Sequence, residues 1–448
     1  MDTQIDRLEM DDHTWKDLGI FQSRANGRTL HDILSRTKTQ GGAKILKERM
    51  QRPFSAPQRI RAVQDSIRYI IAHRAAFDCL PSEVVAHGVT EYVNGGLPVV
   101  TSMQPVGAFI EGLTIRLEWR FYMLIMQGAL RTIKMIRGLQ HLLDPALVPG
   151  PVPGELGPLV QELQSLLARP AFQGLPTIES WDLPTRTLFR IDRGFRGLDE
   201  EALRRIVRLV YQVDALVAMA DACITHDMIL PDVVEGPTAV EAEGLVNLFV
   251  PEPVPVDVRL GRPRHMLFLT GPNMAGKSTL LRSLGAALYL AHLGMGVPAR
   301  RFRFAPCQSL VTALDVSDDI HAGVSFFRAE ALRMKAIAEA IKNGRSVVAL
   351  VDEPFKGTNV QDAMDASWLV LRAFARADDS LFAISSHLIE LGDTLLATDR
   401  VVCRHFAATD EATGLVFDFR IRDGVSSQRL GMRVLEQEGL MALLGEEP

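Results

Sequence analysis

The sequence of 448 residues has few of the features that mark several specialised classes of protein. Its four cysteines stand far apart with no C-x-x-C pair, which argues against a disulfide framework or a zinc site and favours reduced core residues. The longest apolar runs, residues 121–130 and 284–297, are too short and too often interrupted to cross a bilayer. Residues 1–16 lack the apolar core of a secretory signal. We therefore expect a cytoplasmic protein with no membrane segment.

Positive charge is not in excess either. The chain carries 49 basic and 54 acidic side chains, for a net charge of −5, so any binding to a phosphate backbone must be local. With 47% hydrophobic and 23% charged residues, the composition is that of a globular protein and excludes disordered and collagen-like chains. No repeat of about 20 to 50 residues is visible, which disfavours a solenoid. The length suggests about two to four domains.

The pattern of apolar residues changes along the chain. Residues 29–235 have the periodicity of helices, interrupted by a turn rich in proline and glycine at residues 148–158. Beyond a second proline-rich stretch, residues 251–263, short apolar strands alternate with helices, as in an α/β domain with a mainly parallel sheet. We expect an N-terminal extension at residues 1–28, a helical domain at 29–235 and an α/β domain at 236–448.

A phosphate-binding loop is the clearest motif. An apolar run typical of a strand is followed by residues 271–279, G-P-N-M-A-G-K-S-T, which fit G-x-x-x-x-G-K-[ST]. Gly271 and Gly276 allow backbone N–H groups to surround phosphate oxygens. Lys277 would bring its charge to the β and γ phosphates, and Ser278 can ligate Mg²⁺. A helix that starts at Lys277 would direct its positive end toward the same anion.

The loop also has a purely structural interpretation. A glycine-rich turn that opens a helix needs neither the lysine nor the serine, so their presence favours a nucleotide site. We therefore predict ATP and Mg²⁺ as cofactors. The loop residues expected to contact the nucleotide are Gly271, Pro272, Asn273, Met274, Ala275, Gly276, Lys277, Ser278 and Thr279.

Two carboxylates follow another apolar run. Residues 346–351 are typical of a strand buried on both faces, and Asp352 and Glu353 come at its carboxyl end, where ligands bind in parallel sheets. Asp352 would hold Mg²⁺, and Glu353 is the candidate general base for the attacking water. An acidic pair after a strand can instead favour the start of a helix. The phosphate loop is what makes the catalytic interpretation the better one.

A histidine follows the next apolar strand. His387 comes directly after residues 381–386 and would lie at the same sheet edge, where it could sense the γ-phosphate or position water. A single histidine after a strand is usually an ordinary loop residue. Its position in the chain, behind the two preceding motifs, supports a functional role, so our predicted catalytic residues are Lys277, Glu353 and His387.

Arginine is concentrated in one helical stretch, which contains four acidic residues in addition. The stretch could follow phosphates along a helix, or it could be a solvated face with local ion pairs, and the sequence supports both interpretations. The arginines are Arg186, Arg190, Arg193, Arg196, Arg204, Arg205 and Arg208.

Together these motifs resemble the MutS family of mismatch-repair ATPases. The run at residues 271–279 is similar to that family's phosphate loop, with Ala275 where glycine is usual, and the resemblance extends in order over residues 29–440. The other similar segments are residues 30–53 (opening of the core), 317–327 (a segment that reaches across a dimer), 352–359 (Walker B) and 386–391 (switch histidine).

The resemblance implies a fold and an assembly. It predicts a helical core and lever domain followed by a P-loop ATPase domain of the ABC type with a mainly parallel sheet, ending in a C-terminal helical dimerisation segment. It also implies a homodimer through the ATPase domain, with Ser325 approaching the partner's nucleotide and Glu330 following it. The family's adenine-side motif departs here at residues 243–247, so Phe249 is our candidate for stacking on the base, with core packing as the equal alternative.

Two departures concern DNA. Family members that read mismatches carry two domains ahead of the core, whereas only residues 1–28 precede it here. The Phe-x-Glu triplet at residues 109–111 lies inside the core region, and about one such triplet is expected by chance. The interval between core opening and ATPase is short for a full DNA clamp, so we expect that clamp to be reduced or absent.

Three hypotheses of function follow. The first is a MutS-like, Mg²⁺-dependent ATPase whose hydrolysis moves helical levers on DNA, in mismatch repair or in the processing of DNA structures. The second keeps the ATP switch but gives the levers a protein partner or a branched nucleic acid, without mismatch recognition. The third, a small-molecule kinase, is less favoured because Glu353 suits attack by water. An ABC transporter ATPase would need a Leu-Ser-Gly-Gly-Gln signature, which the sequence lacks.

Overall fold

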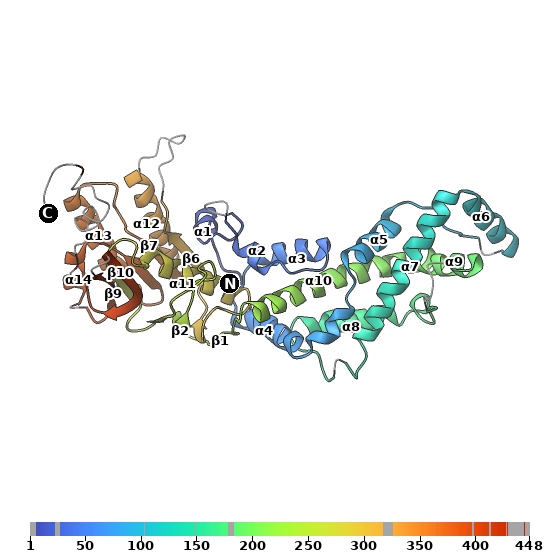
Figure 1. Cartoon of the computed structure of the whole chain (residues 1–448), viewed down its shortest axis with the longest axis horizontal. Helices are drawn as coiled ribbons and strands as arrows, with labels where there is room; N and C mark the ends of the chain where they lie inside the picture. Colours follow the sequence, from blue (N-terminus) through green and yellow to red (C-terminus); the bar gives the residue numbers. More distant parts are fainter. Residues whose placement is uncertain are drawn as a thin grey trace. The chain divides into compact units, whose positions relative to one another are not determined.

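The computed structural model divides the chain into two compact units (Figure 1). The helical unit comprises Leu34–Gln51 and Arg61–Thr225, and the α/β unit comprises Met1–Ile33, Arg52–Ile60 and His226–Pro448. The structure describes residues 6–22, 27–102, 104–147, 149–177, 183–316, 326–396, 398–411, 414–426, 428 and 443. The division into domains predicted from the sequence stays a prediction.

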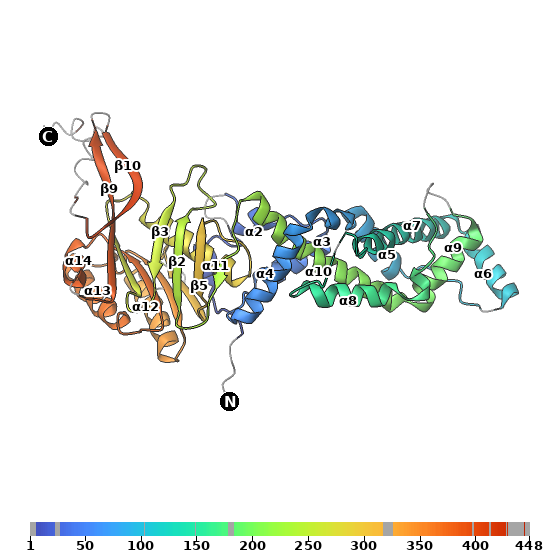
Figure 2. The same ribbon diagram turned by 90° about the horizontal axis from the view of Figure 1, so that it is seen from below.

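The helical unit confirms the predicted run of helices. Its long helix α10 contacts α3, α5 and α8, while α7 contacts α5 and α6 (Figure 2). A single turn of π-helix, Arg193–Leu198, links α9 to α10. The bounds are α3 Gln40–Met50, α4 Pro57–Ala72, α5 Glu83–Asn94, α6 Pro105–Leu117, α7 Trp119–Leu142, α8 Leu156–Leu167, α9 Thr185–Asp192 and α10 Glu200–Thr225.

Two adjacent glycines allow α3 to pack closely on α10. A Cβ atom on Gly41 would lie 2.4 Å from the Tyr211 ring, and one on Gly42 would lie 2.2 Å from a carboxylate oxygen of Asp214. That buried carboxylate accepts hydrogen bonds from the backbone N–H and the hydroxyl of Thr39, which caps α3. The Asp214 side chain of α10 thus both binds the capping residue Thr39 and lies against Gly42, so the start of α3 is determined by α10.

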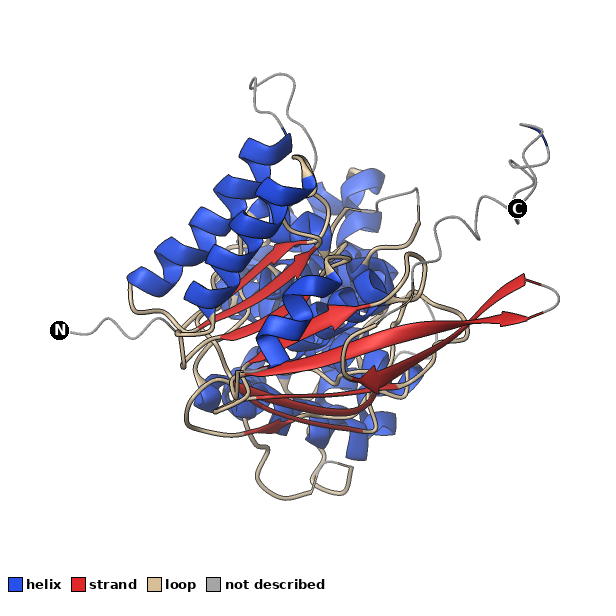
Figure 3. Ribbon diagram, turned by 90° about the vertical axis from the view of Figure 1, so that its left-hand side faces the viewer, coloured by secondary structure: helices blue, strands red, loops and turns tan. Residues whose placement is uncertain are grey.

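The strands of the α/β unit are drawn in red in Figure 3. Six of them form one sheet in the order β10-β9-β4-β8-β7-β6. Neighbouring strands run parallel except β9 and β10, which confirms the predicted mainly parallel sheet. The three central strands β4, β8 and β7 are buried at nearly every position, as their apolar sequences predict. The bounds are β4 Met266–Thr270, β6 Ser309–Ala313, β7 Val347–Asp352, β8 Leu381–Ser385, β9 Val401–Glu411 and β10 Gly414–Asp423.

A second sheet has four strands in the order β1-β5-β2-β3 and was not predicted from the sequence. Its strand β3 lies inside the proline-rich stretch at residues 251–263, which we expected to separate the helical region from the alternating strands and helices. Helices complete the unit, and α11 contacts β6, β7 and β8. The bounds are β1 Asp232–Val233, β2 Ala239–Leu245, β3 Val256–Leu260, β5 Arg301–Ala305, α2 Leu30–Leu34, α11 Lys277–His292, α12 Phe326–Lys342, α13 Val360–Phe374 and α14 Ile389–Leu396.

The described part of the N-terminal extension packs on the α/β unit. Helix α1, Asp12–Asp17, contacts strand β6. The buried Asp17 carboxylate accepts hydrogen bonds from the Thr312 hydroxyl at 2.7 Å and from the backbone N–H of Leu314 at 2.8 Å. Leu18 and Ile20 are buried as well. The extension therefore adds to the core beside an edge strand of the sheet.

The described residues contain neither a membrane-spanning helix nor a disulfide bond. Within these ranges, no helix is both long enough and apolar enough to cross a membrane. All four cysteines are free, and Cys223, Cys307 and Cys403 are buried as small core residues.

Candidate nucleotide-binding site

The predicted phosphate loop connects β4 to α11. Gly271 and Gly276 have φ angles of +137° and +105°, in the region that favours glycine. A Cβ atom on Gly271 would also lie 2.6 Å from the backbone oxygen of Phe406 in β9. Gly276 immediately precedes α11, so the free N–H groups of the first helical turn point at the loop. Both glycines are therefore required by backbone geometry.

Lys277 is held inside the loop. Its ammonium donates hydrogen bonds to the backbone oxygens of Gly271 at 2.9 Å and Pro272 at 3.1 Å, and it lies 3.9 Å from a carboxylate oxygen of Glu353. The side chain is only 5% exposed. Burial lowers the pKa of Lys277, and the charges of Glu353 and Asp352 act in the opposite direction. The loop thus concentrates a positive charge at the sheet edge.

The two predicted carboxylates lie at the carboxyl end of β7, next to Ser385 at the end of β8. The Ser385 hydroxyl donates to the Asp352 carboxylate, and the Ser385 backbone oxygen accepts from the N–H of Glu353 at 3.0 Å. Glu353 has a φ of +50°, which is unusual for a residue other than glycine. Such strain persists only where neighbouring groups hold it and is frequent at functional sites. Sequence reasoning missed Ser385, although a hydroxyl ending a buried strand is a usable signal.

A buried glutamate fixes the segment that follows. Glu330 of α12 is 3% exposed, and its carboxylate accepts hydrogen bonds from the backbone N–H groups of Lys356 at 3.2 Å and Gly357 at 3.3 Å. Burial raises the pKa of Glu330, against the effect of those N–H groups. Phe355, with a φ of +63°, is buried and packs against Phe327. Helix α12 therefore holds the segment next to Glu353 in its strained conformation.

An apolar pocket of about 280 Å³ opens beside the loop. Its walls include Phe406 of β9, Phe419 of β10 and Met274 of the loop itself. Phe249 does not line it and is 43% exposed, so the alternative that Phe249 packs in the core is wrong. Its stacking role stays a prediction, while Phe406 and Phe419 were missed because nothing in their local sequence links them to the loop.

The remaining predicted site residues have different outcomes. His387 is exposed and follows β8, whose neighbours in the sheet are β4 and β7, so it lies at the edge that carries the loop and the carboxylates. Ser278 and Thr279 begin α11. Ser325 and most of the predicted C-terminal dimerisation segment lie outside the described residues.

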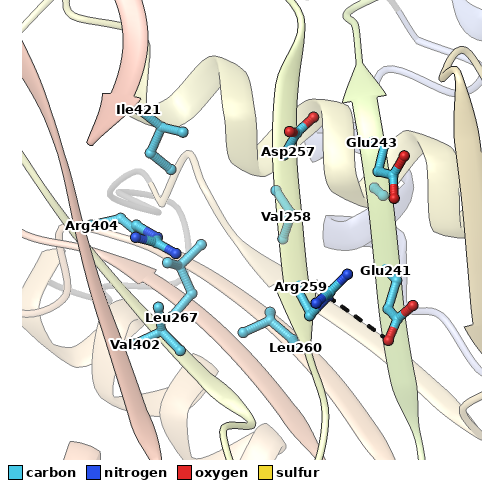
Figure 4. Close-up of a pocket in the computed structure, with 11 residues that line it drawn as sticks. Glu241, Glu243, Asp257, Val258, Arg259, Leu260, Leu267, Val402, Arg404 and Ile421 are labelled. Atoms are coloured by element: carbon cyan, nitrogen blue, oxygen red, sulfur yellow. Dashed lines mark ion pairs between the residues drawn. The ribbon is translucent and has the colours of Figure 1, made fainter. Parts of the chain in front are cut away.

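A separate cavity of about 310 Å³ lies between β2 and β3 on one side and β4, β9 and β10 on the other (Figure 4). Its charged residues occur with both signs, for example Glu241, which lies 3.9 Å from Arg259. No residue of the phosphate loop lines it. This cavity therefore offers no concentrated positive charge for a phosphate group.

Comparison with known families identifies the region around the loop. Residues 267–443 match the family model for MutS domain V, which confirms the predicted resemblance for this part of the chain. The matched region includes Lys277, Asp352, Glu353 and His387.

Proposed function

We propose that this chain, whose residues 267–443 form a MutS domain V and hence an ABC-type ATPase domain, uses ATP hydrolysis to drive a conformational switch on DNA. The observation that carries the proposal is the convergence of one cation from the start of α11 with two carboxylates from the end of β7. Lys277 lies 3.9 Å from Glu353, and Asp352 lies beside Glu353 at the end of β7. This is the arrangement that phosphoryl transfer requires.

ATP would bind with its phosphates in the loop. The backbone N–H groups from Gly271 to Thr279 and the positive end of α11 favour an anion, and the ammonium of Lys277 can exchange its loop carbonyls for phosphate oxygens. The pocket beside the loop would take the base, with Phe406 and Phe419 as apolar walls. Phe249 does not line this pocket and stays a separate stacking candidate.

The available ligands fit a magnesium ion. Ser278 supplies a hydroxyl and Asp352 a carboxylate, and Mg²⁺ prefers oxygen ligands together with water and substrate phosphates. Within the described residues, no group of three histidines, cysteines or acidic residues could enclose a metal alone. This agrees with an ion shared with the nucleotide, whose chemistry is to neutralise charge on the phosphates.

Glu353 is the proposed general base. Its carboxylate is half-buried at the sheet edge, where it can orient water for in-line attack on the γ-phosphorus while Lys277 stabilises the charge that develops. His387, exposed at the end of β8, would contact the γ-phosphate or the water. Hydrolysis would then remove the γ-phosphate that Lys277, Glu353 and His387 have in common, and this loss is the basis of a switch.

The proposed assembly is a homodimer through the ATPase domain, with Ser325 completing the partner's site. The family resemblance supports this assembly. DNA is the proposed partner of the helical unit, supported by the same resemblance and by exposed arginines on α9. Mismatched, branched and fully paired duplexes should therefore differ in how strongly they stimulate ATP hydrolysis.

The test compares Glu353→Gln with Lys277→Ala and a control, Glu339→Gln, whose side chain is exposed on α12. Phosphate release, ATP binding and mass in solution are measured with Mg²⁺, with and without the DNA panel. Glu353→Gln should bind ATP but release no phosphate, Lys277→Ala should lose ATP binding, and the control should match the wild type. Unchanged turnover in Glu353→Gln would overturn the assignment.

A further inference from the structure

A groove of about 790 Å³ in the helical unit is lined by residues of α6, α9 and the π-helical turn. Four arginines line it, and no acidic residue does. Its other notable residues are two aromatic rings, one from α6 and one from α9. The four arginines are Arg116, Arg186, Arg190 and Arg193, and the two rings are Phe109 and Phe189.

Three of the four arginines that line this groove have no partner among the described residues. The fourth, Arg193, donates a hydrogen bond to the backbone oxygen of Ser102 at 3.4 Å, and its charge acts on Glu111. Arg186 and Arg190 stand four residues apart on one face of α9, and within the described residues neither has a hydrogen bond or ion pair, nor does Arg116. The nearest acid of α6, Glu111, is engaged by the backbone N–H groups of Thr101 at 2.8 Å and Ser102 at 3.1 Å. The groove therefore favours an anionic ligand.

Three other arginines of the stretch behave differently. Arg196 is buried against Asp192, with a nitrogen-to-oxygen distance of 2.6 Å. Arg205 pairs with Glu162 at 2.6 Å, and Arg204 pairs with Glu200 at 2.5 Å. These three arginines serve the fold. The two alternatives left open by the sequence thus apply to different members of the stretch, and the unpaired arginines of α9 face the groove.

Helix α6 also exposes an apolar face. Val106, Phe109, Leu113 and Leu117 follow one another at helical spacing and are 71%, 66%, 45% and 78% exposed. Trp119, at the start of α7, is 68% exposed. Contiguous apolar surface of this kind marks a binding site.

One of the two aromatic rings in the groove, Phe189, is held by its neighbours. A Cβ atom on Gly112 would lie 3.2 Å from the Phe189 ring, so the absence of a side chain there lets α6 pass directly over that ring. Tyr122 packs edge-on against Phe189 at 6.2 Å between ring centroids. Phe109 lies on α6 with most of its surface exposed. The groove thus presents flat apolar surfaces beside unpaired guanidinium groups.

We propose that this groove binds unpaired nucleotides of a DNA strand, with phosphates on Arg186, Arg190 and Arg116 and bases against Phe109 and Phe189. The inference rests on the proposed function in taking DNA as the partner of the helical unit. A single strand offers phosphates and free base faces together, whereas a duplex stacks its bases inside and leaves the apolar face of α6 in water. A second copy is disfavoured because two such grooves would repel each other.

The test measures fluorescence anisotropy of a labelled oligo(dT) of about 20 nucleotides with the full chain, against a duplex of equal length and an acidic amphipathic peptide. Arg186→Gln/Arg190→Gln should weaken oligo(dT) binding about tenfold or more and reduce the slope of log K against log salt by about 1.4. Phe109→Ala should weaken it about fivefold or more with the slope unchanged. The controls are Arg208→Gln and Val84→Ala, which change exposed residues of the same unit outside the groove.

Each outcome decides the proposal. The proposal is supported if the chain binds oligo(dT) more tightly than the duplex and if only the groove variants lose affinity for oligo(dT). Equal or tighter binding of the duplex, preference for the peptide, or equal losses in the controls would overturn it. ATP hydrolysis without DNA is measured in parallel, because the groove variants should retain it and Glu353→Gln should retain oligo(dT) binding. Failure of the groove and failure of the ATPase proposal are therefore distinguishable.

Discussion

Replacing Glu330 with alanine should slow ATP hydrolysis while leaving ATP binding intact. Glu330 does not line the apolar pocket beside the phosphate loop. Its carboxylate instead accepts hydrogen bonds from the backbone N–H groups of Lys356 and Gly357, which follow the proposed general base, Glu353, by three and four residues. Glu330→Ala leaves both donors without that acceptor. The conformation of the segment that carries Glu353 should then be less populated.

The expected magnitude follows from those two contacts. A hydrogen bond to a charged group contributes about 1.5–3 kcal/mol, and these two are partly buried, so their loss with partial relaxation should cost about 2–4 kcal/mol. Glu353 and Phe355 both have positive φ angles, and each such strained residue disfavours the observed conformation by a further amount of about 1–3 kcal/mol. Without Glu330 the segment can relax that strain. Since about 1.4 kcal/mol corresponds to a factor of ten in rate, we expect kcat to fall at least about tenfold.

The assay separates kcat from KM for ATP and measures nucleotide affinity directly. Glu330→Gln keeps one oxygen acceptor and should give an intermediate kcat, while Glu339→Gln on the same helix should match the wild type. A purely structural defect would lower both affinity and the unfolding midpoint. An unchanged kcat in Glu330→Ala, with the variant folded, would refute the reasoning.

Two further predictions concern stability. Burial lowers the pKa of His292 to about 4. As the pH falls, the imidazole is therefore protonated in the unfolded chain before it is protonated in the folded chain, and the free energy of unfolding decreases. Protonation of His292 should lower the free energy of unfolding by about 2 kcal/mol between about pH 7 and 5. The thermal unfolding midpoint of His292→Gln should therefore depend less on pH over that range. Separately, Asp192→Ala leaves the buried Arg196 without its carboxylate and should cost about 3–5 kcal/mol in urea unfolding, more than Asp192→Asn. If Asp192→Ala and Asp192→Asn lowered the free energy of unfolding equally, hydrogen bonding by the side chain at position 192 would not contribute to stability.

The parts of the site that follow from local sequence could be predicted. The strands β4, β7 and β8 are continuous apolar runs, and the side chains that end them necessarily meet at one edge of a parallel sheet. The glycines of the loop have the φ angles that their positions in the motif require. These features depend on neighbours in the chain, so the spacing of residues was sufficient to predict them.

The contacts that depend on distant segments could not be predicted. Phe406 and Phe419 lie on β9 and β10, and β9 pairs with β4 although far from it in sequence. Register between such strands is decided by packing across the whole sheet rather than by a local pattern. The arginine-rich stretch shows the same limit, because only the folded chain brings Glu162 to Arg205 and leaves Arg186 without a partner among the described residues.

The geometry of Glu353 is determined by three elements outside its own strand. Ser385 of β8 accepts from its N–H, Lys277 of α11 lies 3.9 Å from its carboxylate, and Glu330 of α12 holds the backbone that follows. A glutamate with a φ of +50° persists only where neighbours restrict it in this way. An Asp-Glu pair after a strand is therefore no signature of catalysis by itself. What distinguishes this pair is that separate segments of the fold converge to maintain it.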